Sequence, residues 1–431
     1  MFRSVGRGIH QVGRSVCTLT EELSWRGLIT DISSATQLST LLPTSPGVYC
    51  GFDPTARSLH VGNLVGLLLL RRLQDAGARP YVLLGGATGL LGDPSGKHEE
   101  RVLLPAEEVE ANVASIAKCV DVLFPQGVQV VNNKDWVGEL SAIDLLREYG
   151  KHFRVSAMLA KESVAGRMAG SGISYTEFSY QVIQGLDFAH LHASHGVNIQ
   201  LGGSDQWGNI TAGLDLIRRR RGTGDQPDAP AVGLTYPLLT TGDGVKLGKS
   251  AGNAVWLDPD LTPPYQLYQY FMRAPDDDLF RLLAALTFLD RPQIASALDA
   301  HALNPKERSG QELLAHQVTQ IVHGIDAADE AQDSSRALFA SNGPSSSIDP
   351  SSLPTHPLPP SPYPVSLVSI VVAAGLAPSK AEAKRIAKGG GLYVNDVSVD
   401  PSYVLTERDL DHAWKGALVR VGKRKQVVVT F

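Results

Sequence analysis

The chain reads Tyr49-Cys-Gly-Phe-Asp-Pro-Thr-Ala-Arg-Ser-Leu-His-Val-Gly-Asn63 where a short apolar strand meets an apolar helix. The pattern predicts a buried strand over 48–52, a turn at Asp53-Pro-Thr55 and a helix from Asn63. Ligands of open α/β sheets bind at the carboxyl ends of strands, and a helix N-terminus favours phosphate. The stretch therefore predicts a nucleotide site. A partner motif downstream would indicate activation of a carboxylate by ATP.

Strand-like and helical runs alternate from about Trp25 to Thr241. Such alternation favours an α/β domain with a Rossmann-like parallel sheet covered by helices on both faces. The expected strands are 48–52, 81–84, 128–131, 198–201 and 234–239. The expected helices are 63–75, 105–120, 141–149, 174–193 and 207–221.

Beyond this domain the composition changes three times. Residues 263–338 carry helical periodicity, 341–364 are dense in Ser and Pro, and 365–431 form a third compact unit. The Ser/Pro-rich stretch has too few apolar residues to fold and is expected to be a linker. The predicted divisions are 1–24, 25–244, 245–340, 341–364 and 365–431.

The first twenty residues contain Arg3, Arg7 and Arg14, and no acid precedes Glu21. This is the composition of a mitochondrial transit peptide, so 1–24 is expected to direct the chain to the mitochondrial matrix. A disordered basic tail is the alternative.

The remaining composition sets bounds on function. The net charge of -5 does not favour nucleic-acid binding by the chain as a whole, so any such role needs local basic patches. Three cysteines show no metal or redox spacing, which fits a reducing compartment. The longest apolar run is far too short for a membrane span, so no membrane partner is expected.

A second motif, Lys246-Leu-Gly-Lys249-Ser250, lies in a glycine-rich segment. Two lysines three residues apart can offset the charge that grows on a leaving pyrophosphate. Alone, the motif more often marks a solvated basic loop. Paired with His60-Val-Gly-Asn63, it resembles the His-Ile-Gly-His and Lys-Met-Ser-Lys-Ser signatures of class I aminoacyl-tRNA synthetases, in order and in spacing.

Three further segments carry polar groups at strand or helix ends. Asp93, followed by Lys97 and Arg101, comes after a glycine-rich run and can pair with an ammonium group. Tyr180, Gln184 and Asp187 share one helix face. Asp205 in Gly202-Gly-Ser-Asp-Gln-Trp-Gly-Asn209 suits a ribose. Ordinary turns, a solvated helix face and a capping turn are the respective structural alternatives.

Together these segments resemble the tyrosyl-tRNA synthetases of bacterial and organellar type, over roughly residues 25–431. The resemblance implies tyrosine, ATP as its Mg²⁺ complex and tRNA(Tyr) as substrates, with no tightly bound cofactor or protein metal site, and a homodimer. It implies tyrosine binding by Tyr49, Asp93, Tyr180, Gln184, Asp187, Gln200 and Gln206. It implies ATP binding by Cys50, Asp53, His60, Gly62, Asp205 and Lys249, and catalysis by Thr55, His60, Asn63, Lys97, Arg101, Lys246 and Lys249.

Within this scheme Tyr49 and Asp187 would hydrogen-bond the phenol, while Asp93, Tyr180 and Gln184 would hold the ammonium group. The chain departs from the family pattern at Asn63, where a second His is usual. Leu247-Gly248 also replaces Met-Ser but leaves both lysines in place.

The resemblance also assigns the helical part to anticodon binding and the last unit to an α+β S4-like RNA-binding domain. RNA contacts are expected from Lys380, Lys384, Arg385 and Lys388, with a solvated helix face as the alternative. The implied function is tyrosine–tRNA ligation for mitochondrial translation. Two competing functions are an RNA-folding scaffold on a synthetase fold and a related enzyme for tryptophan. Tyr49 and Asp187 oppose the latter because an indole offers one donor and no acceptor.

Overall fold

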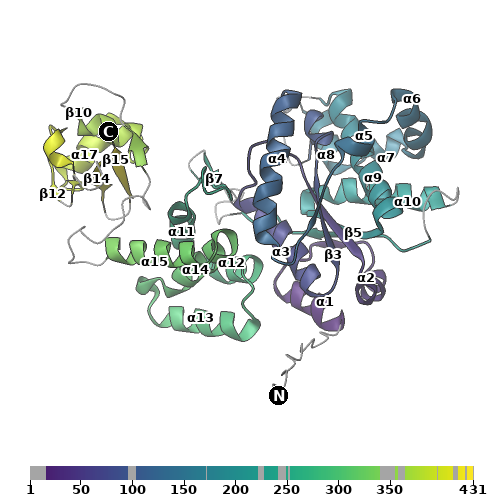
Figure 1. Ribbon diagram of the computed structural model, residues 1–431, viewed down its shortest axis with the longest axis horizontal. Helices are drawn as coiled ribbons and strands as arrows, with labels where there is room; N and C mark the ends of the chain where they lie inside the picture. The colour runs from purple at the N-terminus through teal and green to yellow at the C-terminus, as the bar shows by residue number, and fades with distance from the viewer. Residues whose placement is uncertain are drawn as a thin grey trace, which may run out of the picture. The chain divides into compact units, whose positions relative to one another are not determined.

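The computed structural model describes residues 16–95, 103–170, 172–221, 228–240, 249–250, 253–339, 355–357, 365–395, 397–410, 416–422 and 425–430. The chain forms two compact units, drawn in Figure 1. The first comprises Met1–Leu257 with Phe280–Leu289, and the second comprises Asp258–Leu279 with Asp290–Phe431.

A six-stranded sheet forms the centre of the first unit, in the order β1-β6-β5-β2-β3-β4. Its strands are β1 (Asp31–Ile32), β2 (Gly47–Phe52), β3 (Arg79–Leu84), β4 (Gln129–Asn132), β5 (Val197–Gly203) and β6 (Val232–Tyr236). All neighbours are parallel except β1, which pairs antiparallel with β6. The predicted Rossmann-like sheet is confirmed, with the two-residue β1 as an unpredicted edge strand.

Helices cover both faces of this sheet. The helices of the first unit up to residue 221 are α1 (Val16–Trp25), α2 (Ala35–Leu41), α3 (Val61–Asp75), α4 (Ala106–Leu123), α5 (Lys134–Val137), α6 (Ala142–Asp144), α7 (Val155–Leu159), α8 (Glu162–Met168), α9 (Tyr175–His195) and α10 (Trp207–Arg221). Phe188 of α9 and Leu216 of α10 pack with Tyr49 and Tyr81 on one face. Adjacent strand residues point to opposite faces, so Cys50 faces the side covered by α3. The predicted helix over 141–149 is α6 followed by a π-helical turn, Leu145–Tyr149.

The direction of chain progression across the sheet reverses between β2 and β5. From β2 the chain proceeds to β3 and β4 on one side, and later returns to place β5 on the other side. The carboxyl ends of β2 and β5 therefore border the crevice in which ligands of such sheets bind.

Residues 280–289 belong to the first unit although the sequence assigns them to the helical part. They contain most of α12 (Leu279–Leu286). Arg26, buried just after α1, donates to the carbonyl oxygens of Ala284 at 2.9 Å and Leu289 at 2.7 Å. Arg72 of α3 donates to Thr287 O. These buried bonds attach the segment to the rest of the first unit, and sequence periodicity does not reveal them.

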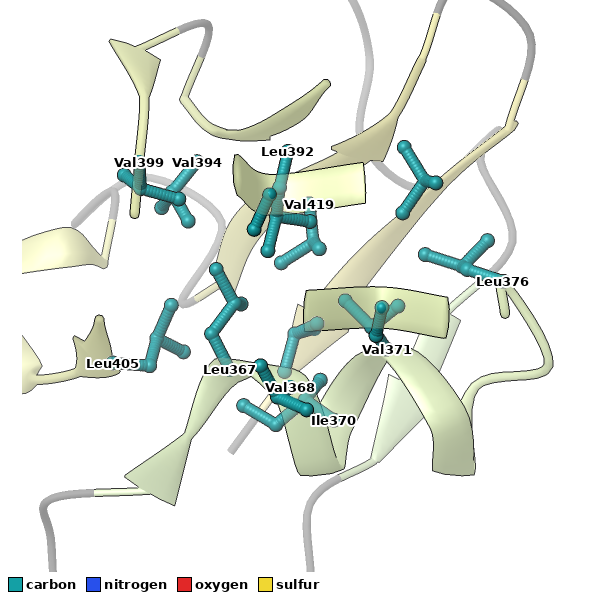
Figure 2. Close-up of a cluster of buried hydrophobic side chains, with 14 of the residues drawn as sticks. Leu367, Val368, Ile370, Val371, Leu376, Leu392, Val394, Val399, Leu405 and Val419 are labelled. Atoms are coloured by element: carbon teal, nitrogen blue, oxygen red, sulfur yellow. The ribbon is translucent and has the colours of Figure 1, made fainter. Parts of the chain in front are cut away.

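The second unit contains a helical part and an α+β part. The helices are α11 (Pro264–Met272), α13 (Arg291–Leu303), α14 (Ser309–His323) and α15 (Ile325–Phe339), then α16 (Leu367–Ala373) and α17 (Lys380–Lys388). The α+β strands are β9 (Thr355–Pro357), β10 (Val365–Ser366), β11 (Leu392–Val394), β12 (Val397–Ser398), β13 (Val404–Leu405), β14 (Gly416–Val421) and β15 (Lys425–Thr430). Figure 2 shows its core, in which Leu367 and Val371 of α16 meet Leu392 and Val419 of the sheet.

One prediction about the linker needs correction. Within 341–364, which was expected not to fold, Thr355–Pro357 forms β9 and pairs in parallel with Val428–Thr430. Proline is tolerated there because β9 is the last strand of the sheet, where a missing N–H does not break the ladder. Among the described residues, none of the helices combines the length and hydropathy that a membrane span requires.

Candidate active site

A cavity of about 460 Å³ opens at the carboxyl ends of β2 and β5 in the first unit. It brings together most of the residues that the sequence predicts for the site. These are Tyr49, Asp53, Thr55, His60, Gly62, Asn63, Asp93, Tyr180, Gln184, Asp187, Gln200, Asp205 and Gln206.

Asp187 lies on the buried face of α9 and is 1% exposed. Its Oδ1 accepts a hydrogen bond from Trp136 Nε1 at 2.8 Å, and its Oδ2 accepts one from Asn133 Nδ2 at 3.0 Å. Burial raises the pKa of this carboxyl to about 7, although the two hydrogen bonds oppose the shift. The two donors therefore fix the orientation of the Asp187 carboxyl as an acceptor. Its raised pKa means that it is protonated easily as the pH falls below 7.

Asn133 and Trp136 are site residues that the sequence analysis missed. They follow β4, which runs parallel to β3 and so ends at the same edge of the sheet as β2 and β5. An amide and an indole placed directly after a predicted strand are the signal that could have identified them.

Three buried polar atoms of the cavity wall have no hydrogen-bond partner among the described residues. They are the Tyr49 hydroxyl and the Oε1 atoms of Gln184 and Gln200. Tyr49 is 1% exposed, and its ring packs on Phe188 with centroids 5.5 Å apart. Buried polar atoms are nearly always paired, so these three indicate that a polar ligand occupies the cavity.

Asp53 belongs to a chain of hydrogen bonds that links Tyr180 to Asp187. Its Oδ2 accepts from the Tyr180 hydroxyl at 2.8 Å, and its Oδ1 accepts from Thr88 Oγ1 at 2.7 Å. Asn133 Nδ2 donates to the same Thr88 oxygen at 3.0 Å and also to Asp187. Gly85 permits this arrangement, because a Cβ there would overlap the Asp53 carboxylate. We call the chain Tyr180–Asp53–Thr88–Asn133–Asp187 the floor network.

Asp93 occupies another part of the wall and is 6% exposed. Its Oδ2 accepts from Gln206 Nε2 at 2.8 Å, and its Oδ1 accepts from Ser95 N at 2.9 Å. Asn209 donates in turn to Gln206 Oε1 at 3.2 Å. The carboxylate is thus oriented before any cation binds, and Asn209 is a further supporting residue that the sequence analysis did not assign.

His60 is the N-cap of α3, so its imidazole stands at the positive end of that helix. Its Nδ1 accepts from Gly62 N at 2.9 Å, which places the proton of the neutral ring on Nε2. Asn63 Oδ1 accepts from His60 N at 3.0 Å and completes a capping box. The residue that departs from the signature therefore fixes the backbone of His60.

The second signature is described only in part. Lys249–Ser250 forms β7, which pairs with β8 (Asn253–Ala254), and Lys249 lies opposite Ala254. Ala254 lines the cavity, so the hairpin ends at the cavity wall. Lys246, Lys97 and Arg101 lie outside the described residues.

The Cys50 thiol does not line the cavity. It is 1% exposed on the sheet face opposite Tyr49, and its Sγ lies 3.8 Å from the Tyr236 hydroxyl. Burial raises its pKa to about 12. ATP binding by Cys50 stays a prediction, because the residue lies between Tyr49 and Gly51 and contacts Tyr236, and all three of these line the cavity.

The predicted RNA-binding residues lie outside the first unit. The four expected RNA-binding residues are exposed on α17, where Arg385 pairs with Glu382 at 2.6 Å. No group of three or more His, Cys, Asp or Glu side chains within the described ranges could hold a metal ion.

Comparison with known proteins gives consistent matches over most of the chain. A family model for class I tRNA synthetases (W and Y) matches residues 44–340, and an S4 domain model matches 365–411. A tyrosine–tRNA ligase of Lactobacillus johnsonii is 41% identical over 95% of this chain and 98% of its own length. One from Opitutus terrae is 45% identical over 96% and 99%. A C-terminally truncated mitochondrial tyrosyl-tRNA synthetase of Aspergillus nidulans has a TM-score of 0.68 at 32% identity, covering 75% of this chain and 97% of its own.

Proposed function

The chain belongs to the class I tyrosyl-tRNA synthetases, and we propose that it joins tyrosine to tRNA(Tyr) for translation in mitochondria. The observation that carries the substrate assignment is the set of unpartnered polar atoms beside Asp187. A phenol can donate its proton to the Asp187 carboxylate and accept from the Tyr49 hydroxyl. These are the two complementary roles of a hydroxyl group.

The other end of the substrate meets a different set of groups. Asp93 and the free Oε1 of Gln184 suit an ammonium group. The Tyr180 oxygen can also accept from it while the Tyr180 hydroxyl donates its own proton to Asp53 Oδ2. Tyrosine would then present its carboxylate towards His60 and the N-terminus of α3.

The reaction depends on positioning of the substrates and on stabilisation of the transition-state charge, and it needs no protein nucleophile. A tyrosine carboxylate oxygen bonds to the α-phosphorus of ATP as the bond to pyrophosphate breaks. A ribose hydroxyl of the tRNA terminus then attacks the carbonyl carbon, and AMP leaves. His60 can donate through Nε2 to a phosphate oxygen, beside the first-turn amides of α3. ATP enters with Mg²⁺ as part of the substrate.

One experiment tests this assignment. ATP–pyrophosphate exchange, measured with each of the twenty amino acids, should run with tyrosine and be far slower with phenylalanine and tryptophan. Faster exchange with tryptophan would overturn the substrate. No exchange with any amino acid would favour an RNA-folding scaffold instead.

The mitochondrial destination is supported by the basic, acid-free start of the sequence. Residues 16–25 form α1, whose Leu19 and Leu23 are 5% and 1% exposed. Cleavage at residue 24 would remove these core side chains, so we place the end of the leader before Val16. Import into isolated mitochondria, followed by N-terminal sequencing of the mature chain, tests this. A variant that starts at Val16 should be active but not imported.

A homodimer is supported by apolar side chains that the first unit leaves exposed between residues 143 and 175. They are Ile143, Leu146, Val155, Leu159, Met168 and Tyr175. Contiguous apolar surface is typical of interaction sites, and we infer that these side chains form such a surface. The double variant Leu146→Asp/Tyr175→Asp should be monomeric by light scattering, whereas Val122→Asp, also at an exposed apolar residue, should remain dimeric.

We propose that two parts of the second unit bind tRNA(Tyr). The helical part would bind the anticodon, and α17 would make further RNA contacts. Substitution of Lys384 and Lys388 by Ala should raise the KM for tRNA(Tyr) and leave tyrosine-dependent exchange unchanged. Loss of exchange in that variant would contradict a role confined to RNA.

A further inference from the structure

Trp256 lies where the two signature segments meet. The β7–β8 hairpin places Lys249 opposite Ala254, and two residues later Trp256 forms an antiparallel bridge with His60. Val61 N donates to Val255 O at 2.9 Å, and Leu257 N donates to Leu59 O at 2.8 Å. One extended run of backbone therefore carries the pairing partner of Lys249 and the pairing partner of His60.

The indole side chain points to the cavity, unlike its neighbours. Val255 and Leu257 are 8% and 4% exposed, whereas Trp256 is partly exposed and lines the cavity. Side chains alternate along an extended segment, so the two aliphatic neighbours anchor the run while the indole faces the opposite way. A large aromatic group in this place adds little to the core.

The indole meets the His60 imidazole edge to face. The ring centroids are 6.3 Å apart and the planes lie at 60°, within the range of favourable aromatic pairs. Gly62 N already holds Nδ1 of the same ring. The amide and the indole together restrict the direction in which Nε2–H can donate.

We propose that Trp256 is a positioning residue that holds the His60 imidazole against the reacting phosphate. The role rests on the proposed function, because it matters only if His60 stabilises charge during adenylate formation. Stabilisation of this kind depends on donor placement to within a fraction of an ångström. Through its bridge, Trp256 also couples the strand pair that carries Lys249 to His60, so that Lys249 and His60 move together.

A double-mutant cycle tests the proposal with the full-length chain. The variants are Trp256→Ala, Trp256→Phe, His60→Ala and Trp256→Ala/His60→Ala. The readouts are the single-turnover rate constant of tyrosyl-adenylate formation, the KM for ATP and the Kd for tyrosine. Trp256→Ala should lower the rate constant about tenfold by displacing a catalytic group. The tyrosine Kd should stay unchanged, and Trp256→Phe should restore most of the rate.

The His60→Ala background decides the mechanism. If Trp256 acts through His60, the double variant should be no slower than His60→Ala alone. A tenfold loss in both backgrounds, with a raised KM for ATP, would overturn the proposal and make Trp256 a direct nucleotide contact. A Trp256→Ala chain that does not fold is replaced by Trp256→Leu, for which the same cycle gives the same two outcomes. Absence of tyrosine-dependent exchange in the unaltered chain would instead remove the proposed function itself.

Discussion

The substitution Asp187→Asn separates recognition of the phenol from every other contact of the substrate. The change keeps the shape of the side chain but removes its charge and turns one acceptor oxygen into a donor. Asn133 and Trp136 each donate to one oxygen of Asp187. Whichever way the new amide turns, one of those buried donors faces an NH₂ group, and the phenol loses its charged acceptor.

The expected magnitude follows from that geometry. A hydrogen bond to a charged group contributes about 1.5–3 kcal/mol, which corresponds to about 10- to 150-fold in an equilibrium or rate ratio. The ratio of kcat/KM for tyrosine to that for phenylalanine should therefore fall by about that factor. The fold should persist, because burial already disfavours the charge that is removed.

The assay is ATP–pyrophosphate exchange with tyrosine and with phenylalanine. Asp93→Asn is the matched control, since both amino acids carry the ammonium group that Asp93 would hold. It should lower kcat/KM for both substrates equally and leave their ratio unchanged. An unchanged ratio in Asp187→Asn would refute the assignment of Asp187 to the phenol.

Four further outcomes are expected. Burial raises the pKa of Asp187 to about 7. The tyrosine Kd measured by calorimetry should therefore be constant at high pH and rise as the pH falls through 7. The Asp187→Asn variant should show no such pH dependence. The free energy of unfolding should depend on pH in the opposite sense. The stabilisation linked to Asp187 is fully present below about 3.9, the pKa of an unfolded Asp, and is lost as the pH rises through about 7. Urea unfolding across that pH range measures this loss. Gly85→Ala should push Asp53 away and slow adenylate formation about tenfold or more in stopped-flow experiments, and an unchanged rate would refute the importance of the floor network. Arg167→Ala should cost about 3–5 kcal/mol in urea unfolding because it strands the buried Glu177, whereas Arg167→Met/Glu177→Leu should stay near wild-type stability.

Sequence reasoning performs best where the determining signals are local. The strand, turn and helix from β2 to α3 follow from apolar periodicity and turn residues, so Tyr49, Thr55 and His60 are placed correctly at the cavity. The same holds for Asp205 and Gln206 at the end of β5.

Long-range contacts account for what the sequence does not reveal. Asn133 and Trp136 reach Asp187 across 54 and 51 residues. The attachment of residues 280–289 depends on Arg26, more than 250 residues away. β9 is a strand only because β15 pairs with it, since its own composition is typical of a linker. These features are set by tertiary pairing, which one-dimensional patterns do not encode.

The floor network has a practical consequence for redesign of the amino-acid pocket. Asn133 bonds both Asp187 and Thr88, and Thr88 bonds Asp53. A library that randomises Asp187 to admit a new side chain will therefore disturb Asp53, which we assign to ATP binding, so that altered selectivity is bought with slower turnover. Leu83 lines the same cavity with an aliphatic side chain. Reshaping the pocket from that wall first would leave the shared hydrogen bonds in place.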